Sequence, residues 1–495
     1  MSRADARGRS GKSASLSRAL HAVLDLVEFD RLDVADAVRR WSEQDTPHPG
    51  VERWVAHAVA NVRGADAKIE DLPPGLLPVS RWWARQRPAE QGDPGVYEET
   101  VQGRRYETED GVREIRLLRY RSVKGRPVDD REVAFAAGVV AGASPVLSNP
   151  WSKTEYLLGR FEAPDQVRIV EVGCADGSAN VLFTGTRQDA LDRYSVVEES
   201  LTDAVTGSGY LPGYDCARCV LVDICPVVPS MPGLLGVEGG TGPRRSWSVT
   251  TARTYDSCPA RAYFYQLSLP GDRAVEDTDA TRRGKAVHHW IEQRHRADPA
   301  CACGASDVPN SADSWVSGDH HVEGEQARLG VQMIGDHSLV CPLRGLPADA
   351  QVLPEHLVVV FDPTANVVVV AKTDLLYQDA DGWVLRETKT QHRPGHGDLF
   401  EDYPQLTLAT VLSADGLFTE GEVGLRVEIE RLTGAGPILT AVEVDDPAIV
   451  ARARKELTSL VEGWFEDTEH PTKSGTACRD CPFTRWCPDA RKVLK

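Results

Sequence analysis

The sequence predicts an α/β protein in which a mixed β-sheet flanked by helices is present twice. Three observations lead to this prediction. Short runs rich in β-branched residues alternate with amphipathic segments of helical length. A stretch rich in Pro and Gly at 226–245 divides the chain into two halves. Short motifs recur in the same order in both halves, as expected for a duplicated domain.

The composition is that of a globular protein with more than one core. The chain has 495 residues, of which 41% are apolar and 26% charged. No apolar run approaches the ~20 residues of a membrane helix, and the N-terminus lacks the apolar core of a signal peptide. We therefore expect a cytoplasmic protein whose eleven cysteines are thiols or metal ligands rather than disulfides. The net charge of −18 disfavours nucleic-acid binding by the molecule as a whole but leaves local basic patches open.

The second half has the clearer pattern. Its helical segments are interrupted by strand-length runs, and a DADG turn joins two of these runs into a hairpin. The segment 298–322 is predicted to be a loop. The predicted helices are 252–267, 276–297, 403–414 and 447–465, and the predicted strands are 357–361, 366–378, 382–390, 426–432 and 438–444.

The first half repeats these motifs. YETEDG (106–111) matches YQDADG, and DDREVAFAAGVVAGA (129–143) has the pattern of EDYPQLTLATVLSAD. VRIVEV (167–172) matches VEIERL, and a Cys-x2-Cys-x5-Cys triad closes each half. The predicted organisation is a disordered tail at 1–18, a first domain at 19–228 whose residues 19–85 are mainly helical, a linker at 229–245 and a second domain at 246–495.

A candidate metal site lies on the predicted hairpin of the second half. Asp374 ends one strand, and Glu387 and Lys389 lie on the next strand with their side chains on the same face. Two carboxylates supply the oxygen ligands that Mg²⁺ or Mn²⁺ prefers. A neighbouring lysine can orient or deprotonate an attacking water and stabilise charge on a phosphate.

Several motifs in their order resemble the RecB-like branch of the PD-(D/E)XK nucleases. They are SWSVTTARTYDSCPARAYFYQLSLP (246–270), RGKAVHHWIE (283–292), KTDLLY, RETKT and YPQLTLA. The resemblance covers about 246–490 and implies a restriction-endonuclease-like fold. It also implies metal ligands at His288, Asp374 and Glu387, a catalytic Lys389, and Gln405 near the scissile phosphate. The chain departs from the family at two positions, with Ala371 in place of the usual Gly and Ala409 in place of the usual Tyr.

The cysteines extend this resemblance to the iron–sulfur nucleases of the AddB type and of CRISPR adaptation. It implies that a [4Fe–4S] cluster is held by Cys258, Cys478, Cys481 and Cys487. A zinc site on the same four thiols is the alternative.

The first triad would hold a second cluster or zinc through Cys216, Cys219 and Cys225. Its fourth ligand would be Cys174 or Cys258, and the motif context assigns Cys258 to the second site. Cys301, Cys303 and Cys341 have no partner pattern and are predicted to be free thiols.

The first half is predicted to be an inactivated copy. Aligned from YETEDG, Asp374 falls on Gly103, and Glu387 and Lys389 fall on Arg116 and Leu118. A two-residue gap instead pairs RETK with REIR, which retains Glu114 but replaces the lysine by Arg116. Arginine does not release its proton at working pH, so it cannot activate water as a lysine can. The basic residues here are expected to hold a DNA strand by its phosphates, namely Arg116, Arg119, Arg121 and Lys124.

The expected function is therefore that of a metal-dependent DNA nuclease, acting as an exonuclease on single-stranded or unwound DNA in repair, recombination or phage defence. A separate helicase or a defence or repair subunit would be its partner. One alternative is a catalytically impaired iron–sulfur scaffold that binds DNA within a helicase–nuclease complex. Another alternative is RNA as the substrate.

Overall fold

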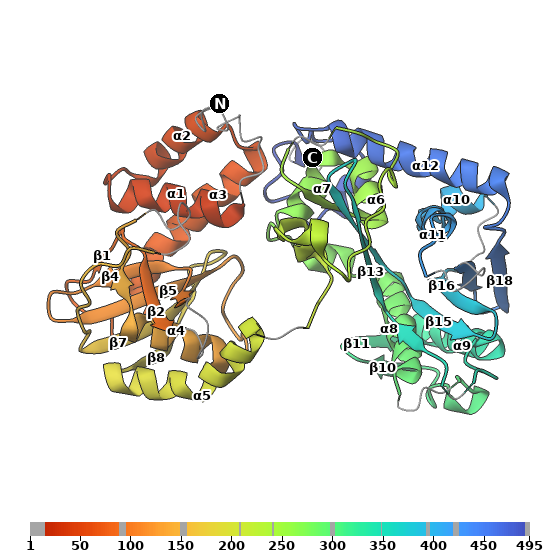
Figure 1. Cartoon of the computed structure of the whole chain (residues 1–495), viewed down its shortest axis with the longest axis horizontal. Helices are drawn as coiled ribbons and strands as arrows, with labels where there is room; N and C mark the ends of the chain where they lie inside the picture. Colours follow the sequence, from red (N-terminus) through yellow and green to blue (C-terminus); the bar gives the residue numbers. More distant parts are fainter. Residues whose placement is uncertain are drawn as a thin grey trace. The chain divides into compact units, whose positions relative to one another are not determined.

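The computed structural model describes residues 15–88, 96–148, 156–206, 209–239, 242–297, 302–347, 349–392, 397–418 and 425–490 (Figure 1). It consists of two compact units. Unit 1 comprises residues up to 209 together with 264–271 and 485–488, and unit 2 comprises 210–263, 272–484 and 489–495. Every helix among the described residues is too short or too polar to span a bilayer.

Unit 1 combines a three-helix group with a five-stranded sheet. The helices are α1 (Leu16–Glu28), α2 (Val34–Asp45) and α3 (Pro49–Gly64). The sheet has the order β1-β4-β5-β7-β8, with β1 (Leu77–Pro78), β4 (Arg104–Glu107), β5 (Val112–Arg119), β7 (Gln166–Gly173) and β8 (Ala179–Thr186). A second sheet has the order β3-β2-β6, with β2 (Trp83–Pro88), β3 (Val96–Thr100) and β6 (Ser144–Pro145).

Two helices cover the five-stranded sheet of unit 1. They are α4 (Asp130–Gly142) and α5 (Arg187–Thr206), and small residues of α4 pack with Ile115 and Ile169 in one apolar core. Asp129 caps α4 by accepting hydrogen bonds from the backbone N–H groups of Arg131 and Glu132. The core thus depends on small side chains in α4, which allow this helix to approach both the sheet and α5 closely.

Unit 2 contains a five-stranded sheet of order β12-β15-β16-β17-β18 and a three-stranded sheet of order β13-β14-β9. The first consists of β12 (Val352–Pro354), β15 (Leu375–Asp379), β16 (Gly382–Thr390), β17 (Arg426–Leu432) and β18 (Pro437–Val442). The second consists of β13 (Leu357–Asp362), β14 (Val367–Lys372) and β9 (Arg245–Trp247). A separate hairpin is formed by β10 (Ser314–Ser317) and β11 (His320–Glu323).

Helices flank the five-stranded sheet of unit 2. On one side, α11 (Pro404–Ala414) and α12 (Pro447–Glu466) pack in the main core with α6 (Val249–Ser257). Another core joins α8 (Asp279–His295) and α9 (Gly324–Val340) to Leu432 of β17. The remaining helices are α7 (Pro259–Gln266) and the short α10 (Leu399–Asp402). The predicted fold class, a mixed sheet flanked by helices, is confirmed for this part of the chain.

The two five-stranded sheets have the same topology. In each, the first two pairs are antiparallel, the third pair is parallel and the last pair is antiparallel. One helix, α4 or α11, connects the two parallel strands, and another, α5 or α12, follows the last strand. The sequence motifs that repeat between the halves lie on these equivalent elements.

In three segments the structure differs from what the sequence predicts. The stretch at 229–245, expected to be a linker, packs through Met231, Leu234 and Leu235 into the core of unit 2, because the backbone N–H groups of Gly233 and Leu235 donate to buried Asp362. The first cysteine triad groups with unit 2 as well.

Within the segment 298–322, expected to be a loop, the hairpin of β10 and β11 forms because Trp315 and Val322 bury their side chains. The expected disordered tail lies outside the described residues up to residue 14, and residues 16–18 already belong to α1.

A glycine in α4 provides a test of the core of unit 1. A Cβ added at Gly138 would lie 2.2 Å from the ring of Tyr194, whereas a Cβ at Gly64, the last residue of α3, meets nothing within 4 Å. We expect Gly138→Ala to lower the free energy of unfolding by about 1–3 kcal/mol, because the clash exceeds the gain in helix propensity. The control Gly64→Ala should leave stability unchanged or raise it by up to about 1 kcal/mol. Urea unfolding of the full chain followed by circular dichroism measures both, and equal effects would contradict the packing described here.

Candidate functional site

The predicted site lies where one long hairpin of unit 2 passes from the three-stranded sheet to the five-stranded sheet. The strands β13 and β14 pair in the first sheet, and β12 and β15 pair in the second. Between them, Thr373 donates its backbone N–H to the carbonyl of His356 at 2.9 Å, and Glu355 donates to the carbonyl of Asp374 at 3.1 Å. The pairing therefore continues through the break, and Asp374 stands at the start of β15.

Three side chains converge at this break. His288 of α8 places its Nδ1 atom 3.2 Å from Oδ1 of Asp374. One ligand atom each from His288, Asp374 and Glu355 lies within 4.8 Å of the other two. Two carboxylates and an imidazole at this separation are a suitable donor set for a divalent cation. The structure thus brings together two of the three predicted metal ligands and adds Glu355, which the sequence analysis missed.

Glu355 is held in an unusual backbone conformation. Its φ angle is +54°, in the left-handed region that non-glycine residues rarely adopt. Such strain costs about 1–3 kcal/mol and is concentrated at functional sites. Its carboxylate also pairs with Lys372. The isolated position of Glu355 between two short strands explains why no spacing rule identified it.

Glu387 and Lys389 lie on β16 beside this group. Their side chains form an ion pair, as expected for two residues on the same face of a strand. Glu387 is not a member of the group within 4.8 Å, although it is near enough to interact with the charges of Asp374 and His288. Burial raises the pKa of Glu387 to about 7, and the negative charge of Asp374 adds to this effect while Lys389 opposes it. The site thus concentrates negative charge that a cation would neutralise.

The charges of His288, Asp374 and Lys389 shift one another's pKa values. Burial lowers the pKa of His288, but the charge and hydrogen bond of Asp374 outweigh burial and leave this pKa raised. Burial would raise the pKa of Asp374, yet the charges of His288 and Lys389 lower it below its usual value. The backbone N–H of Thr388 also donates to Oδ2 of Asp374 at 2.7 Å, which fixes the orientation of the carboxylate.

A pocket of about 230 Å³ lies next to Glu387. Its polar lining includes Ser248, Thr250, Lys372 and Gln405, and its apolar wall includes Ala409. The Oε1 atom of Gln405 is buried without a hydrogen-bond partner, and such an atom is rare in a folded protein. Gln405 thus has an amide oxygen without a partner beside this pocket.

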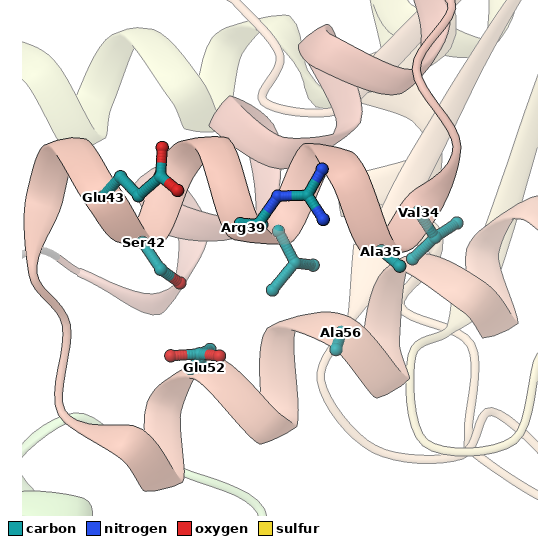
Figure 2. Close-up of a pocket in the computed structure, with 8 residues that line it drawn as sticks. Val34, Ala35, Arg39, Ser42, Glu43, Glu52 and Ala56 are labelled. Atoms are coloured by element: carbon teal, nitrogen blue, oxygen red, sulfur yellow. The ribbon is translucent and has the colours of Figure 1, made fainter.

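Another hollow lies in unit 1, between α2 and α3 (Figure 2). It has a volume of about 620 Å³ and is lined by residues such as Arg39, Ser42 and Glu52. None of the site residues predicted from the sequence lines it.

The basic residues predicted to hold DNA are largely engaged in ion pairs within unit 1. Arg116 is only 3% exposed and pairs with Glu114 and Asp66, so it has almost no surface to offer a phosphate. Arg119 pairs with Glu132 and Glu171. Arg121 and Lys124 remain exposed. The strand β5 therefore presents less positive charge at the surface than its sequence indicates, because Arg116 and Arg119 pair with carboxylates.

The two cysteine triads have different surroundings. In the C-terminal one, the backbone N–H of Lys473 lies 3.4 Å from Cys258 Sγ, and the Sγ of Cys478 lies 4.0 Å from the carbonyl of Lys473. Lys473 thus connects the remote cysteine to the triad. In the first triad, Cys216 and Cys225 border a small apolar cluster with β13 and β14.

Cys174 is one of the two candidates for the fourth ligand of the first triad. It is fully buried in unit 1, and burial raises the pKa of its thiol to about 12. A metal ligand must be the thiolate, which these surroundings disfavour.

Two of the cysteines predicted to have no partners do have them. Cys303 and Cys341 lie in the interior of unit 2 beside His295 and His337. Neither forms a disulfide, as predicted, but the sequence pattern gave no sign of the two histidines, which are distant in the sequence. Cys301 lies outside the described residues.

Comparison with known proteins agrees with this geometry. Residues 246–488 match the family model of the PD-(D/E)XK nuclease superfamily. No curated protein matches the chain. The matched segment contains all of the residues that converge at the hairpin break.

The assignment of Glu355 can be tested by metal binding. We expect Glu355→Gln to weaken Mn²⁺ binding at least about tenfold, because the amide lacks the negative charge of the ligand it replaces. Glutamine retains the length of the side chain, so the fold should be unaffected. Isothermal titration with Mn²⁺ measures the affinity, and Glu325→Gln, at an exposed position of α9, serves as the matched control. Equal affinities in the two variants would exclude Glu355 from the metal site.

Proposed function

Because residues 246–488 form a domain of the PD-(D/E)XK nuclease superfamily, we propose that the chain is a metal-dependent deoxyribonuclease that hydrolyses phosphodiester bonds. The observation that carries this proposal is the convergence of His288, Asp374 and Glu355 at the hairpin break, with Glu387 and Lys389 beside them.

The donor set fits a hard divalent cation. His288, Asp374 and Glu355 would hold Mg²⁺ or Mn²⁺ together with Glu387, whose buried carboxylate adds negative charge. When bound, such an ion polarises a phosphate and lowers the pKa of a coordinated water. The protein contributes the fixed orientation of Asp374, through Thr388 N–H, and the placement of His288 by α8.

Three further side chains would act on the substrate. Lys389 would orient the attacking water and stabilise negative charge on the scissile phosphate. The amide of Gln405 would contact the bound strand in the adjoining pocket. Arg253 of α6 is exposed, and its charge acts on Lys389, so it would add positive charge for the nucleic-acid backbone.

We propose single-stranded or unwound DNA as the substrate, degraded from its ends, in repair, recombination or phage defence. A separate helicase or defence subunit would supply the unwound strand. RNA is the alternative substrate. The other candidate function, an iron–sulfur scaffold without activity, draws support from Ala409, which lines the pocket where the family usually has Tyr.

Unit 1 would be an inactivated copy of the same domain. The topology of its sheet equals that of unit 2, and Gly103 immediately precedes β4 as Asp374 precedes β15. A Cβ at Gly103 would lie 2.6 Å from the carbonyl oxygen of Arg116, so this position cannot accept an aspartate without rearrangement. In the observed strand register, Leu117 and Arg119 stand where unit 2 has Glu387 and Lys389. These substitutions support a role in binding rather than in catalysis.

We also propose a [4Fe–4S] cluster on Cys258, Cys478, Cys481 and Cys487. The backbone N–H of Lys473, 3.4 Å from Cys258 Sγ, supports it, because hydrogen bonds to the ligating sulfurs tune such clusters. Zinc on the same thiols is the alternative. The first triad, Cys216, Cys219 and Cys225, would hold a second cluster or zinc.

The catalytic assignment makes a kinetic prediction. We expect Lys389→Ala to slow cleavage by about 10²–10³-fold, because the developing charge on the phosphate loses the ammonium group that would stabilise it. The assay follows degradation of linear and circular single-stranded DNA and of RNA with Mg²⁺ or Mn²⁺, using protein purified without oxygen.

Lys455→Ala, at an exposed position of α12, is the matched control and should cut at the wild-type rate. Sparing of the circular DNA would identify an exonuclease. Equal rates for Lys389→Ala and wild type would refute the assignment, and an inactive wild type would favour the scaffold.

The cluster makes a separate prediction. Cys258→Ala should lose the iron and sulfide of one cluster, about four atoms of each per chain, because one of its four ligands is absent. Cys174→Ala removes a thiol outside both triads and should retain the wild-type content. Iron and acid-labile sulfide are measured on anaerobically purified protein. An unchanged iron content in Cys258→Ala would reject Cys258 as a ligand.

A further inference from the structure

Two histidines and two cysteines face one another in the interior of unit 2. His295 is the last residue of α8, His337 lies on α9, Cys341 directly follows α9, and Cys303 lies between these helices in sequence. Their exposed fractions are 2% for His295, 1% for His337, 0% for Cys303 and 5% for Cys341. Four potential metal ligands are therefore gathered where water is excluded.

The distances between these side chains match the edges of a tetrahedron around one ion. Bonds of ~2.3 Å to sulfur and ~2.05 Å to nitrogen place tetrahedral ligand atoms about 3.3–3.8 Å apart. The Nε2 atom of His295 lies 3.6 Å from Cys303 Sγ, 3.5 Å from Cys341 Sγ and 3.3 Å from His337 Nε2. All four ligand atoms lie within 4.8 Å of one another. A binuclear iron–sulfur centre would need its ligands farther apart.

The surroundings orient the ligands as in known zinc sites. Nδ1 of His337 lies 2.8 Å from Oε1 of buried Glu430 on β17. A carboxylate accepts a hydrogen bond, so Nδ1 carries the proton and Nε2 presents a lone pair toward the cysteines. The backbone N–H of Cys303 lies 3.3 Å from Cys341 Sγ and stabilises negative charge there. Pairs of this kind, a carboxylate behind a ligating histidine, support zinc in many proteins.

We propose that His295, Cys303, His337 and Cys341 bind a structural Zn²⁺ ion. Two thiolates and two imidazoles in tetrahedral arrangement favour zinc over Mg²⁺, Mn²⁺ or Ca²⁺, which prefer oxygen ligands. Four protein ligands complete the coordination and leave no position for water or substrate, so the site is structural rather than catalytic. It shares no ligand with the hairpin break or with either cysteine triad.

The zinc site would anchor the helix that carries His288. His295 follows His288 by seven residues on α8, about two helical turns, so both side chains lie on the same face of the helix. Thr388 Oγ1 donates to Oε2 of Glu430 at 3.4 Å, and Thr388 N–H donates to Asp374. Zinc bound here would join α8 to the end of α9, with the link to β17 and β16 made by His337, Glu430 and Thr388, and its binding would contribute directly to folding stability.

Zinc content of the full-length protein provides the test, and it does not depend on nuclease activity. We expect the double variant Cys303→Ala/Cys341→Ala to contain one zinc per chain fewer than wild type by elemental analysis. The iron content should be unchanged. Cys174→Ala, another buried cysteine, should retain the wild-type zinc content. A double variant with undiminished zinc, or one that loses iron instead, would overturn the proposal.

A second variant covers the case in which the double variant does not fold. Glu430→Gln leaves all four ligands in place and removes only the charge behind His337. We expect it to lose zinc to a chelator at a concentration about 10–100-fold lower than wild type. Replacement of zinc by Co²⁺ in wild type should produce the visible bands of tetrahedral coordination with thiolate-to-cobalt charge transfer. Unchanged zinc retention in Glu430→Gln, or octahedral cobalt spectra, would contradict the site.

Discussion

The break in the long hairpin of unit 2 is the constraint on which the rest of the site depends. Two backbone hydrogen bonds, between Thr373 and His356 and between Glu355 and Asp374, carry the pairing across the change of sheet. In the register of the flanking strands Glu355 lies directly opposite Asp374, and opposite residues of an antiparallel pair direct their side chains to the same face. The two carboxylates therefore lie together at the change of sheet, where Glu355 adopts a strained left-handed backbone.

Bringing carboxylates together requires compensating charge, and the surrounding elements supply it. Imidazole, ammonium and backbone N–H groups from α8 and β16 face Asp374. Behind the strands, Glu430 is fully buried and is balanced by His337 and by the hydroxyl of Thr388. Buried charges are tolerated in proteins only when paired in this way. The candidate metal centre and the cluster of histidines and cysteines are thus joined through a continuous polar network.

Unit 1 has the same sheet topology as unit 2, but the buried residues of its central strand are different. There the central strand carries Glu114 and Arg116 in a buried ion-pair network with Arg168 and Asp66. These pairs satisfy one another, and the described residues of unit 1 contain no group of carboxylates close enough to hold a cation. Gly103 occupies the position before β4, where the carbonyl of Arg116 approaches too closely for a side chain. Topology alone therefore does not determine the chemistry, which depends on the residues at the start of each hairpin.

The sequence by itself determined the α/β class, many of the strands and helices of the second half, and the placement of Glu387 and Lys389 on one face of a strand, because strand periodicity and local motifs act over a few residues. Only the tertiary structure placed Glu355 beside Asp374 and gathered Cys303 and Cys341 with two histidines. It also buried Arg116 and packed the Pro- and Gly-rich stretch against the core. These outcomes depend on contacts between segments that are distant in the sequence. No short-range pattern in the sequence specifies such contacts.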